Sequence, residues 1–298
     1  MQLRKSERRK AKIKMALQAS SGAGKTMSAI LLAQGLTRGN LSKVAVIDTE
    51  NGSADLYAHL GEYNVISLKP PFTPQKYIQA IEICENAEME VIIIDSISHN
   101  WDYLLDYHSS LVGNSFTNWA KIKPLEKMFI DKILQTDTHV IATMRKKQDY
   151  VLNQKDGKFI PEKVGLKAVQ RDGIDFEFTL VFDIDIKHFA VSSKDRTGLF
   201  MDKPEFKITA TTGQKILEWC NEGVEQEIVT KVSTVDKEID AIKQKIVQSN
   251  NIAELLAIYK QFPEHKERLR PEYEQKKSML MKLSNPQNFS QNGHSQQH

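Results

Sequence analysis

The sequence predicts an α/β fold with a mostly parallel sheet, an antiparallel extension of that sheet, and a small helical appendage near the C-terminus. In the first half of the chain, apolar strand-like runs alternate with helical segments, as is typical of parallel sheets with helices on both faces. Shorter strands with turns between them follow, and helical segments dominate the last quarter. We therefore predict a core over residues 1–223, a helical appendage over 224–283 and a disordered tail over 284–298.

Each expected element of the first half is either a short apolar run, as in strands, or a longer amphipathic segment, as in helices. Residues 13–17 form the first expected strand, and a glycine-containing loop separates them from a helix at 27–36. The further expected strands are 44–48, 65–68, 91–95 and 139–144. The further expected helices are 53–60, 74–86, 97–111 and 127–134.

The second half is expected to add antiparallel strands and then helices. The Asp156-Gly157 step is typical of a hairpin turn, so we place it between two short strands that extend the edge of the sheet. In the appendage, Asn251 with Glu254 is a helix start signal, and Pro271 is suited to open a further helix. The expected short strands are 150–152, 159–160, 176–184, 186–192 and 206–210, followed by a helix at 213–221.

The composition is typical of a globular protein without a membrane span. Of the 298 residues, 40% are hydrophobic and 27% are charged, and the formal net charge is only +3. No apolar run is long enough for a signal peptide or a membrane span, so no membrane partner is expected. Cys84 and Cys220 match neither a disulfide framework nor a zinc site, which favours a reduced, cytoplasmic setting.

A glycine-rich loop lies between the first strand and the first helix and ends in Gly-Lys-Thr. This order of elements is the layout of a P-loop, which binds nucleotide phosphates. Gly22 and Gly24 allow backbone N–H groups to surround phosphate oxygens, Lys25 supplies a positive charge, and the Thr26 hydroxyl can ligate Mg²⁺. ATP and Mg²⁺ are therefore the expected cofactors. The residues expected to bind the nucleotide are Ser20, Ser21, Gly22, Ala23, Gly24, Lys25, Thr26 and Met27.

An acid that could hold Mg²⁺ follows a run of four apolar residues. This acid, Asp95, is expected at the carboxyl end of a buried strand beside the P-loop, where it can hold the ion through water. Ser96 comes next, so a glutamate that orients the attacking water has to come from elsewhere in the sequence. Glu50, just after the strand 44–48, is the candidate. The alternative is that Asp48 and Glu50 only cap a turn and the next helix.

The order of these motifs resembles the RecA-type recombinase core. The P-loop is followed by Val-Ile-Asp-Thr-Glu at 46–50 and by Ile-Ile-Ile-Asp-Ser at 92–96. The resemblance implies a RecA-like P-loop NTPase core, in which the glutamate is catalytic and the second aspartate holds Mg²⁺. It also implies that two basic residues after a late strand reach the ATP of a neighbouring subunit, in a homo-oligomer with ATP at the subunit interface. The expected catalytic residues are Lys25, Glu50, Lys194 and Arg196.

The similarity covers about residues 10–222 and is nearest to compact phage-encoded RecA-like ATPases of the single-strand annealing and recombination type. The sequence departs from the family pattern at Met144 and Arg145. The family has a glutamine at the end of this strand, which couples the DNA site to the ATP site. We expect Arg145 to act there as a phosphate sensor. Residues 233–282 have no counterpart in the RecA core.

Positive charge is concentrated between Arg145 and Arg171, where eight basic residues stand against three acidic ones. In the RecA layout a mobile DNA-binding loop falls here, and in such loops basic side chains neutralise phosphates while aromatic side chains stack on bases. The alternative is a solvated basic hairpin. Residues 109–118 are a candidate companion loop. The residues expected to contact DNA are Lys146, Lys147, Tyr150, Lys155, Lys158, Phe159, Lys163, Lys167 and Arg171.

Together these features predict an ATP-hydrolysing protein that binds single-stranded DNA in phage-type recombination or annealing. Its setting would be the cytoplasm of a bacterial host if the chain is phage-encoded. A single-strand-binding or replication protein is a further expected partner. Two other functions stay open at this point: an ATP-switched adaptor, such as a helicase loader, that contacts a protein through residues 233–282, and a P-loop kinase of small molecules.

Overall fold

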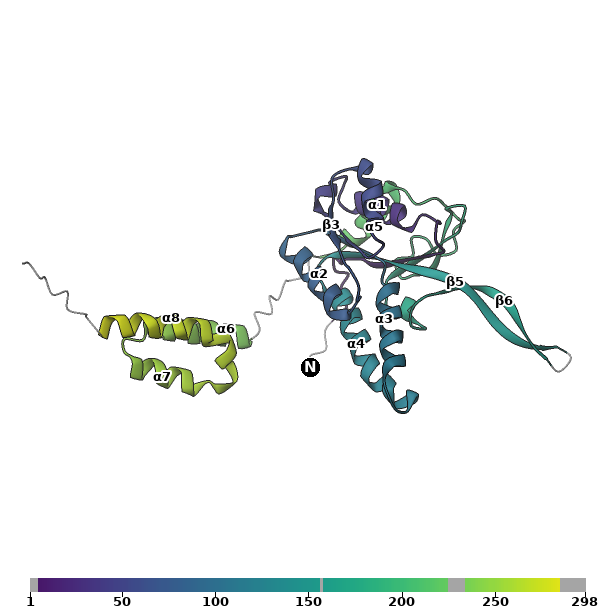
Figure 1. Cartoon of the computed structure of the whole chain (residues 1–298). Coiled ribbons are helices and arrows are strands. Elements are labelled where there is room, and N and C mark those ends of the chain that lie inside the picture. The colour runs from purple at the N-terminus through teal and green to yellow at the C-terminus, as the bar shows by residue number, and fades with distance from the viewer. Residues whose placement is uncertain (1–4, 156–157, 225–233, 285–298) are drawn as a thin grey trace, which may run out of the picture. The chain divides into compact units, whose positions relative to one another are not determined.

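The computed structural model describes residues 5–155, 158–224 and 234–284 (Figure 1). The chain divides into two compact units, residues 1–226 and 227–298. The tail predicted for 284–298 lies, apart from its first residue, outside the described residues, and so do residues 225–233 of the predicted appendage.

The first unit contains a sheet with the strand order β3-β2-β4-β5-β1-β7-β8. All neighbours in this order pair in parallel except β8, which pairs antiparallel with β7 at one edge. The α/β fold with a mostly parallel sheet that the sequence predicts is therefore confirmed. The strands are β1 Lys14–Ala19, β2 Val44–Asp48, β3 Asn64–Ser67, β4 Val91–Asp95, β5 His139–Lys155, β7 Leu180–Ile184 and β8 Ala190–Asp195.

Helices cover both faces of this sheet (Figure 1). The helices α1 and α5 pack on one face with Ile30 and Ile216 in a shared core, and α2 and α4 pack on the other face with Tyr77 and Phe129. Successive residues of β4 alternate between the two cores, which explains why this strand is apolar throughout. The helices are α1 Lys25–Leu36, α2 Pro74–Asn86, α3 Ser98–Ser110, α4 Ser115–Gln135 and α5 Ala210–Asn221.

The helices α1 and α5 approach each other closely because two glycines lie between them. A Cβ on Gly35 would lie 2.1 Å from the carbonyl oxygen of Ala210, and a Cβ on Gly213 would lie 2.2 Å from that of Leu32. Real side chains do not tolerate such distances, so both positions need glycine. The contact fixes α1, which begins at the predicted phosphate-binding loop, against the rest of the core.

Helix α4 is much longer than the helix predicted for 127–134. The side chain of Asn114 caps its start by accepting a hydrogen bond from the backbone N–H of Phe116 at 2.8 Å. The loop predicted over 109–118 is therefore wrong, because the connection between α3 and α4 spans only 111–114. The two helices lie side by side and extend beyond the sheet (Figure 1).

Three shorter segments also differ from the prediction. The strand expected at 206–210 is reduced to a single bridge between Phe206 and Ala190. The helix α5 begins three residues earlier than predicted, because Thr209 and Thr212 form a reciprocal capping box. Residues 54–60 form a 3₁₀ helix, η2, where a short helix was expected.

The strand β5 is one continuous element of 17 residues, which contains both strands predicted at 139–144 and 150–152, so only their separation is wrong. Its first part pairs with β4 and β1, and from Lys146 onward it pairs antiparallel with β6, Lys158–Ala168. Both strands leave the sheet as a long hairpin, here called the β5–β6 arm (Figure 1). The arm thus starts from a central strand and does not extend the edge of the sheet. The turn predicted at 156–157 lies outside the described residues.

The second unit has three α-helices within residues 234–284 and a small apolar core of its own. Asn251 caps the middle helix as predicted, because its side chain accepts a hydrogen bond from the backbone N–H of Glu254 at 2.8 Å. Pro271 was expected to open a helix but lies inside one. The helices are α6 Thr234–Gln248, α7 Ile252–Gln261 and α8 Lys266–Ser284.

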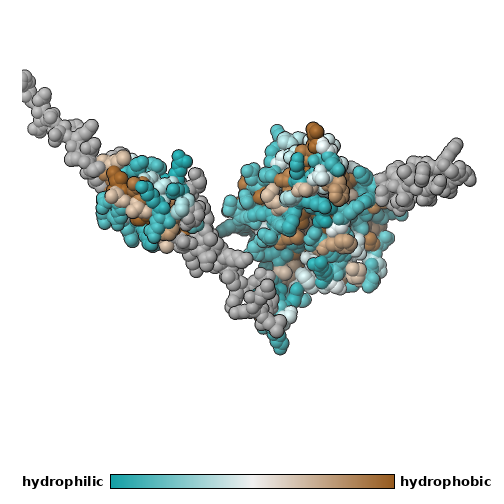
Figure 2. Space-filling view, turned by 90° about the horizontal axis from the view of Figure 1, so that it is seen from below, coloured by the Kyte–Doolittle hydropathy of each residue, from teal (hydrophilic) through white to brown (hydrophobic). Residues whose placement is uncertain are grey.

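Most of the surface seen in Figure 2 is hydrophilic, with hydrophobic side chains distributed over both units. On the second unit, Val247 and Met279 are more than half exposed. Within the described ranges, no helix combines the length and the apolar character needed to cross a membrane.

Candidate nucleotide-binding site

The loop after β1 and the start of α1 border a cavity of about 920 Å³. Glu50, Asp95 and Arg145 line the same cavity, although Glu50 follows β2, Asp95 ends β4 and Arg145 lies in β5. Because the carboxyl ends of parallel strands meet at one edge of a sheet, these distant residues converge there. Ser20 and Ala23 belong to the loop without lining the cavity. The predicted nucleotide-binding residues that line it are Ser21, Gly22, Gly24, Lys25, Thr26, Met27 and Arg145.

The loop has the backbone geometry that phosphate binding requires. Gly22 and Gly24 both have left-handed φ angles, of 80° and 85°, which side chains rarely adopt. A Cβ on Gly22 would meet no atom within 4 Å, so it is the φ angle that favours glycine here. No side chain caps the start of α1. Its first N–H groups are thus available to an anion at the helix N-terminus.

Lys25 is the first residue of α1, and its ammonium group lies over the loop. Its Nζ donates hydrogen bonds to the carbonyl oxygens of Ser20 at 3.0 Å and Ala19 at 3.3 Å. Burial lowers the pKa of Lys25 below its ordinary value, while the charges of Asp95 and Glu50 act in the opposite direction. The lysine is therefore held at the loop by weak neutral acceptors, and its charge is available to phosphates.

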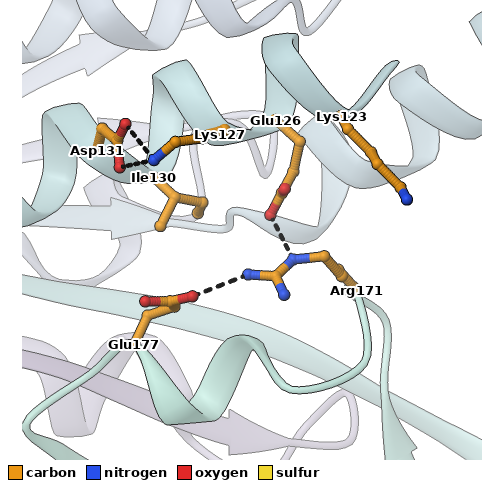
Figure 3. Close-up of a pocket in the computed structure, with 7 residues that line it drawn as sticks. All are labelled: Lys123, Glu126, Lys127, Ile130, Asp131, Arg171 and Glu177. Carbon is orange, nitrogen blue, oxygen red and sulfur yellow. Dashed lines mark hydrogen bonds and ion pairs between the residues drawn. The ribbon is translucent and has the colours of Figure 1, made fainter. Parts of the chain in front are cut away.

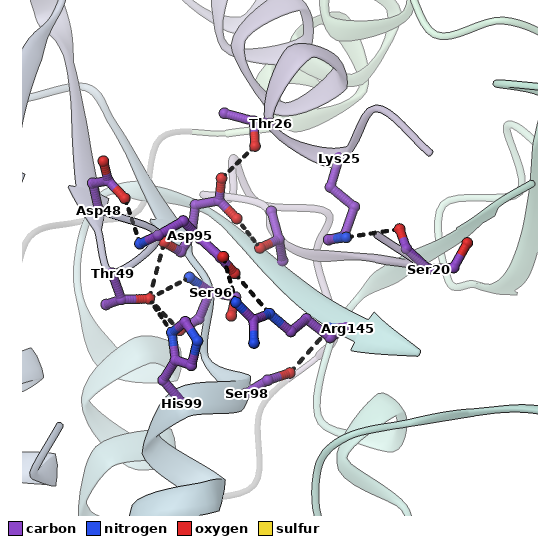
Figure 4. A network of polar contacts seen from close by, with 12 residues as sticks. Ser20, Lys25, Thr26, Asp48, Thr49, Asp95, Ser96, Ser98, His99 and Arg145 are labelled. Atoms are coloured by element: carbon purple, nitrogen blue, oxygen red, sulfur yellow. Dashed lines mark hydrogen bonds and ion pairs between the residues drawn. The ribbon is translucent and has the colours of Figure 1, made fainter. Parts of the chain in front are cut away.

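Thr26 and Asp95 bring a hydroxyl and a carboxylate together. The Thr26 Oγ1 donates to Asp95 Oδ2 at 2.5 Å, and Thr143 donates to the other carboxylate oxygen (Figure 4). Burial raises the pKa of Asp95, and the two hydroxyl hydrogen bonds partly offset this rise.

This donor set fits Mg²⁺, which binds one or two protein oxygens together with phosphates and water. In the part of the chain that the structure describes, no group of three or more His, Cys, Asp and Glu side chains could hold a metal by itself. A metal at this cavity would thus depend on the nucleotide, with Thr26 and Asp95 as the protein donors.

The carboxylate of Glu50 forms a two-bonded ion pair with Arg145. Arg145 Nε donates to Oε1 at 2.9 Å, and a second guanidinium nitrogen donates to Oε2 (Figure 4). Partial burial would raise the pKa of Glu50, but the hydrogen bonds and charge of Arg145 outweigh it, so the pKa lies below the ordinary value. Glu50 is therefore ionised at neutral pH, the state in which it can accept a proton.

Asp48 has a different role from Glu50. Its Oδ1 accepts a hydrogen bond from the Glu50 backbone N–H at 2.6 Å, and its Oδ2 accepts one from the Ala54 N–H at 3.4 Å. Asp48 is buried and thus caps the turn after β2, which leaves the Glu50 side chain directed into the cavity.

Thr49 connects the ends of β2 and β4 beside this pair. Its hydroxyl accepts a hydrogen bond from the Ser96 N–H at 2.9 Å and contacts His99 Nδ1 at 2.7 Å (Figure 4). Burial and the charge of Arg145 lower the pKa of His99, so the ring is neutral at pH 7. Ser98 accepts a hydrogen bond from the Arg145 backbone N–H at 3.0 Å. The segments that carry Glu50 and Arg145 are thereby both hydrogen-bonded to the residues just after β4.

Several residues of the cavity were not predicted from the sequence. Tyr57 and His59 lie in η2, and His188 lies in the turn between β7 and β8 with a contact of 3.1 Å to the Ala23 carbonyl oxygen. Lys207 follows the single bridge that replaced the expected strand. Each comes from a segment without a motif, and only the tertiary fold brings it to the cavity.

Lys194 and Arg196 do not line the cavity of their own chain. The Lys194 Nζ donates to the carbonyl oxygens of Asp175, at 3.0 Å, and Phe176, and Arg196 donates to the Phe176 carbonyl at 3.4 Å. Burial and the neighbouring Arg196 charge lower the pKa of Lys194. The two cations thus gather at one point of the surface.

The basic residues at the base of the β5–β6 arm are largely paired with acids. Lys146 pairs with Asp183 at 2.8 Å and Lys167 pairs with Asp172 at 2.7 Å. Lys147 is exposed and borders the nucleotide cavity. The side chains of Tyr150, Lys155, Lys158, Phe159 and Lys163 lie outside the part that the structure describes.

Arg171 is held where the chain returns from the arm. Its guanidinium donates to Glu126 of α4 at 2.8 Å and to Glu177 at 3.2 Å (Figure 3). Glu126 is nearly buried, with a side-chain exposure of 10%, so this pair is more than a solvated surface contact. Arg171 therefore anchors the end of the arm to α4.

Comparison with known families finds a match to the AAA domain over residues 11–217, which is more than half of the chain. The matched region runs from just before β1 into α5 and includes every residue that lines the nucleotide cavity. No curated protein matches the chain.

Proposed function

Because the chain belongs to the AAA domain family, whose members are generally P-loop nucleoside triphosphatases, we propose that it binds ATP with Mg²⁺ and hydrolyses the ATP at this cavity. The observation that carries the proposal is that the P-loop, Asp95 and Glu50 meet in a single cavity. Phosphoryl transfer to water depends mainly on positioning and charge stabilisation, and the cavity offers groups for both.

Each residue has a defined task in this proposal. Lys25 neutralises charge on the β- and γ-phosphates, and the free N–H groups of α1 hold phosphate oxygens. The Thr26 hydroxyl and, through water, Asp95 would hold Mg²⁺, which would supply further charge neutralisation. Glu50 accepts the proton of the water that attacks the γ-phosphorus, for which its lowered pKa keeps it ionised. Arg145, paired with Glu50, acts as the phosphate sensor.

We propose a homo-oligomer in which Lys194 and Arg196 complete the site of the neighbouring subunit. Two features support this idea: neither residue lines its own cavity, and both gather at one surface point. A cation supplied by a neighbour can stabilise the charge that develops on the transferred phosphoryl group.

We further propose that the β5–β6 arm binds single-stranded DNA, and that the protein acts in phage-type recombination or annealing, together with a single-strand-binding or replication protein. The arm supports this proposal because it continues the strand that carries Arg145. The Arg145 carbonyl oxygen accepts a hydrogen bond from the Val169 N–H at 2.7 Å, so both strands of the arm begin at the nucleotide cavity.

Phosphate release from ATP, measured with and without single-stranded DNA, tests this function. We expect hydrolysis without added substrate and a rate that increases with DNA. A rate that DNA does not change, together with no measurable DNA binding, would contradict the proposal. ADP formation that requires a small-molecule acceptor would instead indicate a kinase.

An ATP-switched adaptor is the second candidate, and the separate helical unit favours it. This unit has its own core and exposes Val247 and Met279, which suits contact with a protein partner. Slow hydrolysis that is insensitive to DNA but changes with a replication protein would support this function over the first.

A further inference from the structure

The turn that follows β8 is organised by one carboxylate. Asp195, the last residue of β8, accepts hydrogen bonds at Oδ1 from the Thr197 N–H at 2.7 Å, the Thr197 hydroxyl and the Gly198 N–H at 3.1 Å. Its Oδ2 accepts from the Phe200 N–H at 2.7 Å and the Met201 N–H at 3.1 Å. Five donors within seven residues thus converge on a single side chain.

This turn contains Arg196 and fixes its backbone on both sides. The Arg196 N–H donates to the Thr179 carbonyl at 3.0 Å, and the next N–H, that of Thr197, donates to Asp195. The far end of the turn is anchored in the core, because Phe200 is only 8% exposed and its ring lies 5.0 Å from that of Phe182. The Arg196 side chain itself is exposed.

Charge at the turn is arranged so that the cations are not neutralised by the acid between them. Asp195 stands between Lys194 and Arg196 in sequence, yet both of its oxygens are occupied by donors of the turn. The two cations instead contact neutral carbonyl oxygens of Asp175 and Phe176. The carboxylate thus shapes the turn while the positive charge beside it remains available.

We propose that Asp195 is a positioning residue for ATP hydrolysis, whose carboxylate holds Arg196 in the direction needed to reach the nucleotide of a neighbouring subunit. This inference rests on the proposed function, in which Lys194 and Arg196 act across a subunit interface. It assigns to Asp195 no contact with the nucleotide of either subunit.

The first test is the Asp195→Asn variant of the full chain. The asparagine amide can be oriented in two ways. In one, its NH₂ group faces the N–H groups of Phe200 and Met201; in the other, it faces the donors that now bond to Oδ1, and those bonds are lost. Since cations supplied in trans contribute about 10³- to 10⁵-fold, even partial misplacement should lower ATP turnover about tenfold or more. ATP affinity should stay within about twofold, because the variant keeps its own P-loop.

Asp202→Asn, which changes an exposed acid beyond the turn, is the matched control. Turnover by Asp195→Asn equal to that of the control would overturn the inference.

The second test separates positioning from a merely structural role by mixing subunits. Lys25→Ala subunits have an intact Arg196 but no working P-loop, so mixing them with Asp195→Asn subunits should restore activity at the mixed interfaces. In a random equal mixture with head-to-tail contacts, about a quarter of the interfaces combine an intact P-loop with an intact Arg196. Total turnover should approach that share of the wild-type rate.

The Arg196→Ala variant, mixed with Lys25→Ala in the same way, distinguishes a failure of the inference about Asp195 from a failure of the proposed shared site. If this mixture regains activity and the Asp195→Asn mixture does not, Asp195 has only a structural role and the inference is overturned while the proposed function stands. If neither mixture regains activity, the proposal of a site shared between subunits is wrong.

Should Asp195→Asn fail to fold, Thr197→Val is the substitute variant. It removes one of the five hydrogen bonds and should show a smaller loss of turnover, which mixing restores. Unchanged turnover in Thr197→Val would then overturn the inference.

Discussion

Glu50, just after β2, and Arg145, in β5, share one ion pair at the cavity. The pair holds the pKa of Glu50 below its ordinary value, because the hydrogen bonds and charge of the guanidinium outweigh the rise that partial burial causes. A carboxylate that stays ionised can accept a proton from water across a wide pH range. The chemistry proposed for Glu50 therefore depends on a contact that no local motif encodes.

Replacing Glu50 by glutamine should separate binding from turnover. The amide keeps the size of the side chain but cannot accept a proton, so we expect ATP affinity within a few-fold of wild type and turnover lowered about a hundredfold or more. Phosphate release and nucleotide titration on the same sample measure both quantities. Glu62→Gln, at an exposed position outside the cavity, serves as the control. Near-normal hydrolysis in Glu50→Gln would show that the base is another residue.

The acidic side of the pH–rate profile should report the same ion pair. Because the pKa of Glu50 is lowered, its ionised form persists until the pH falls below the ordinary range of a glutamate, and turnover should decline only there. In Arg145→Gln the burial remains but the cation is gone, so the acidic limb should move up by about one pH unit or more. An acidic limb at the same pH in both proteins would contradict this role of Arg145.

The sequence predicted the residues of the site that belong to local motifs. The P-loop and Asp95 could be found because glycine, lysine and threonine spacing and an apolar strand are visible in a few neighbouring positions. Tyr57 and His188 could not be found, since they reach the cavity only through η2 and the β7–β8 turn. The roles of Asp48 and Glu50 could not be separated before their side-chain contacts were known.

Among the elements, those with a buried apolar face were predicted well and those without one were not. The strands β2 and β4 and the helix α2 have the predicted bounds, because each contributes to the core. The start of α4 was missed because Pro124 lies within it and its first turns project beyond the sheet. The continuity of β5 was missed because its second half pairs only with β6 and leaves the core.

Charge reversal on the arm tests its proposed contact with DNA. Replacing Lys155, Lys158 and Lys163 by glutamate should weaken single-stranded DNA binding about tenfold or more and flatten the slope of log affinity against log salt by about 0.7 per lost contact. ATP turnover without DNA should change little, because the variant keeps the P-loop, Glu50 and Asp95, which line the cavity. Affinity should depend little on base sequence, since backbone charge and stacking read no base edges.

The matched control reverses three exposed lysines outside the arm, Lys69, Lys215 and Lys260. It changes the net charge of the chain equally and should leave the salt slope unchanged. If the arm variant and this control bind DNA with equal affinity and slope, the arm is a solvated basic hairpin, and the adaptor function becomes the better explanation.

For the whole molecule, the division into two units predicts which activities survive truncation. Every residue that lines the cavity precedes residue 209, and the second unit begins at 227. A chain that ends at residue 226 should therefore bind ATP within about twofold of the full chain, since no binding group is lost. Loss of ATP binding in a truncated chain that still unfolds cooperatively would show that the second unit contributes to the site.

The most direct test of the nucleotide site is ATP turnover by the Lys25→Ala variant of the full chain. Within the described residues, the hydrogen bonds of the Lys25 ammonium go to carbonyl oxygens of its own loop, so its loss should leave the fold intact and shift the melting temperature by no more than about 4 °C. Without the charge that holds the β- and γ-phosphates, we expect phosphate release to fall about a hundredfold or more. Turnover equal to that of the wild type in this variant would contradict ATP hydrolysis at the P-loop.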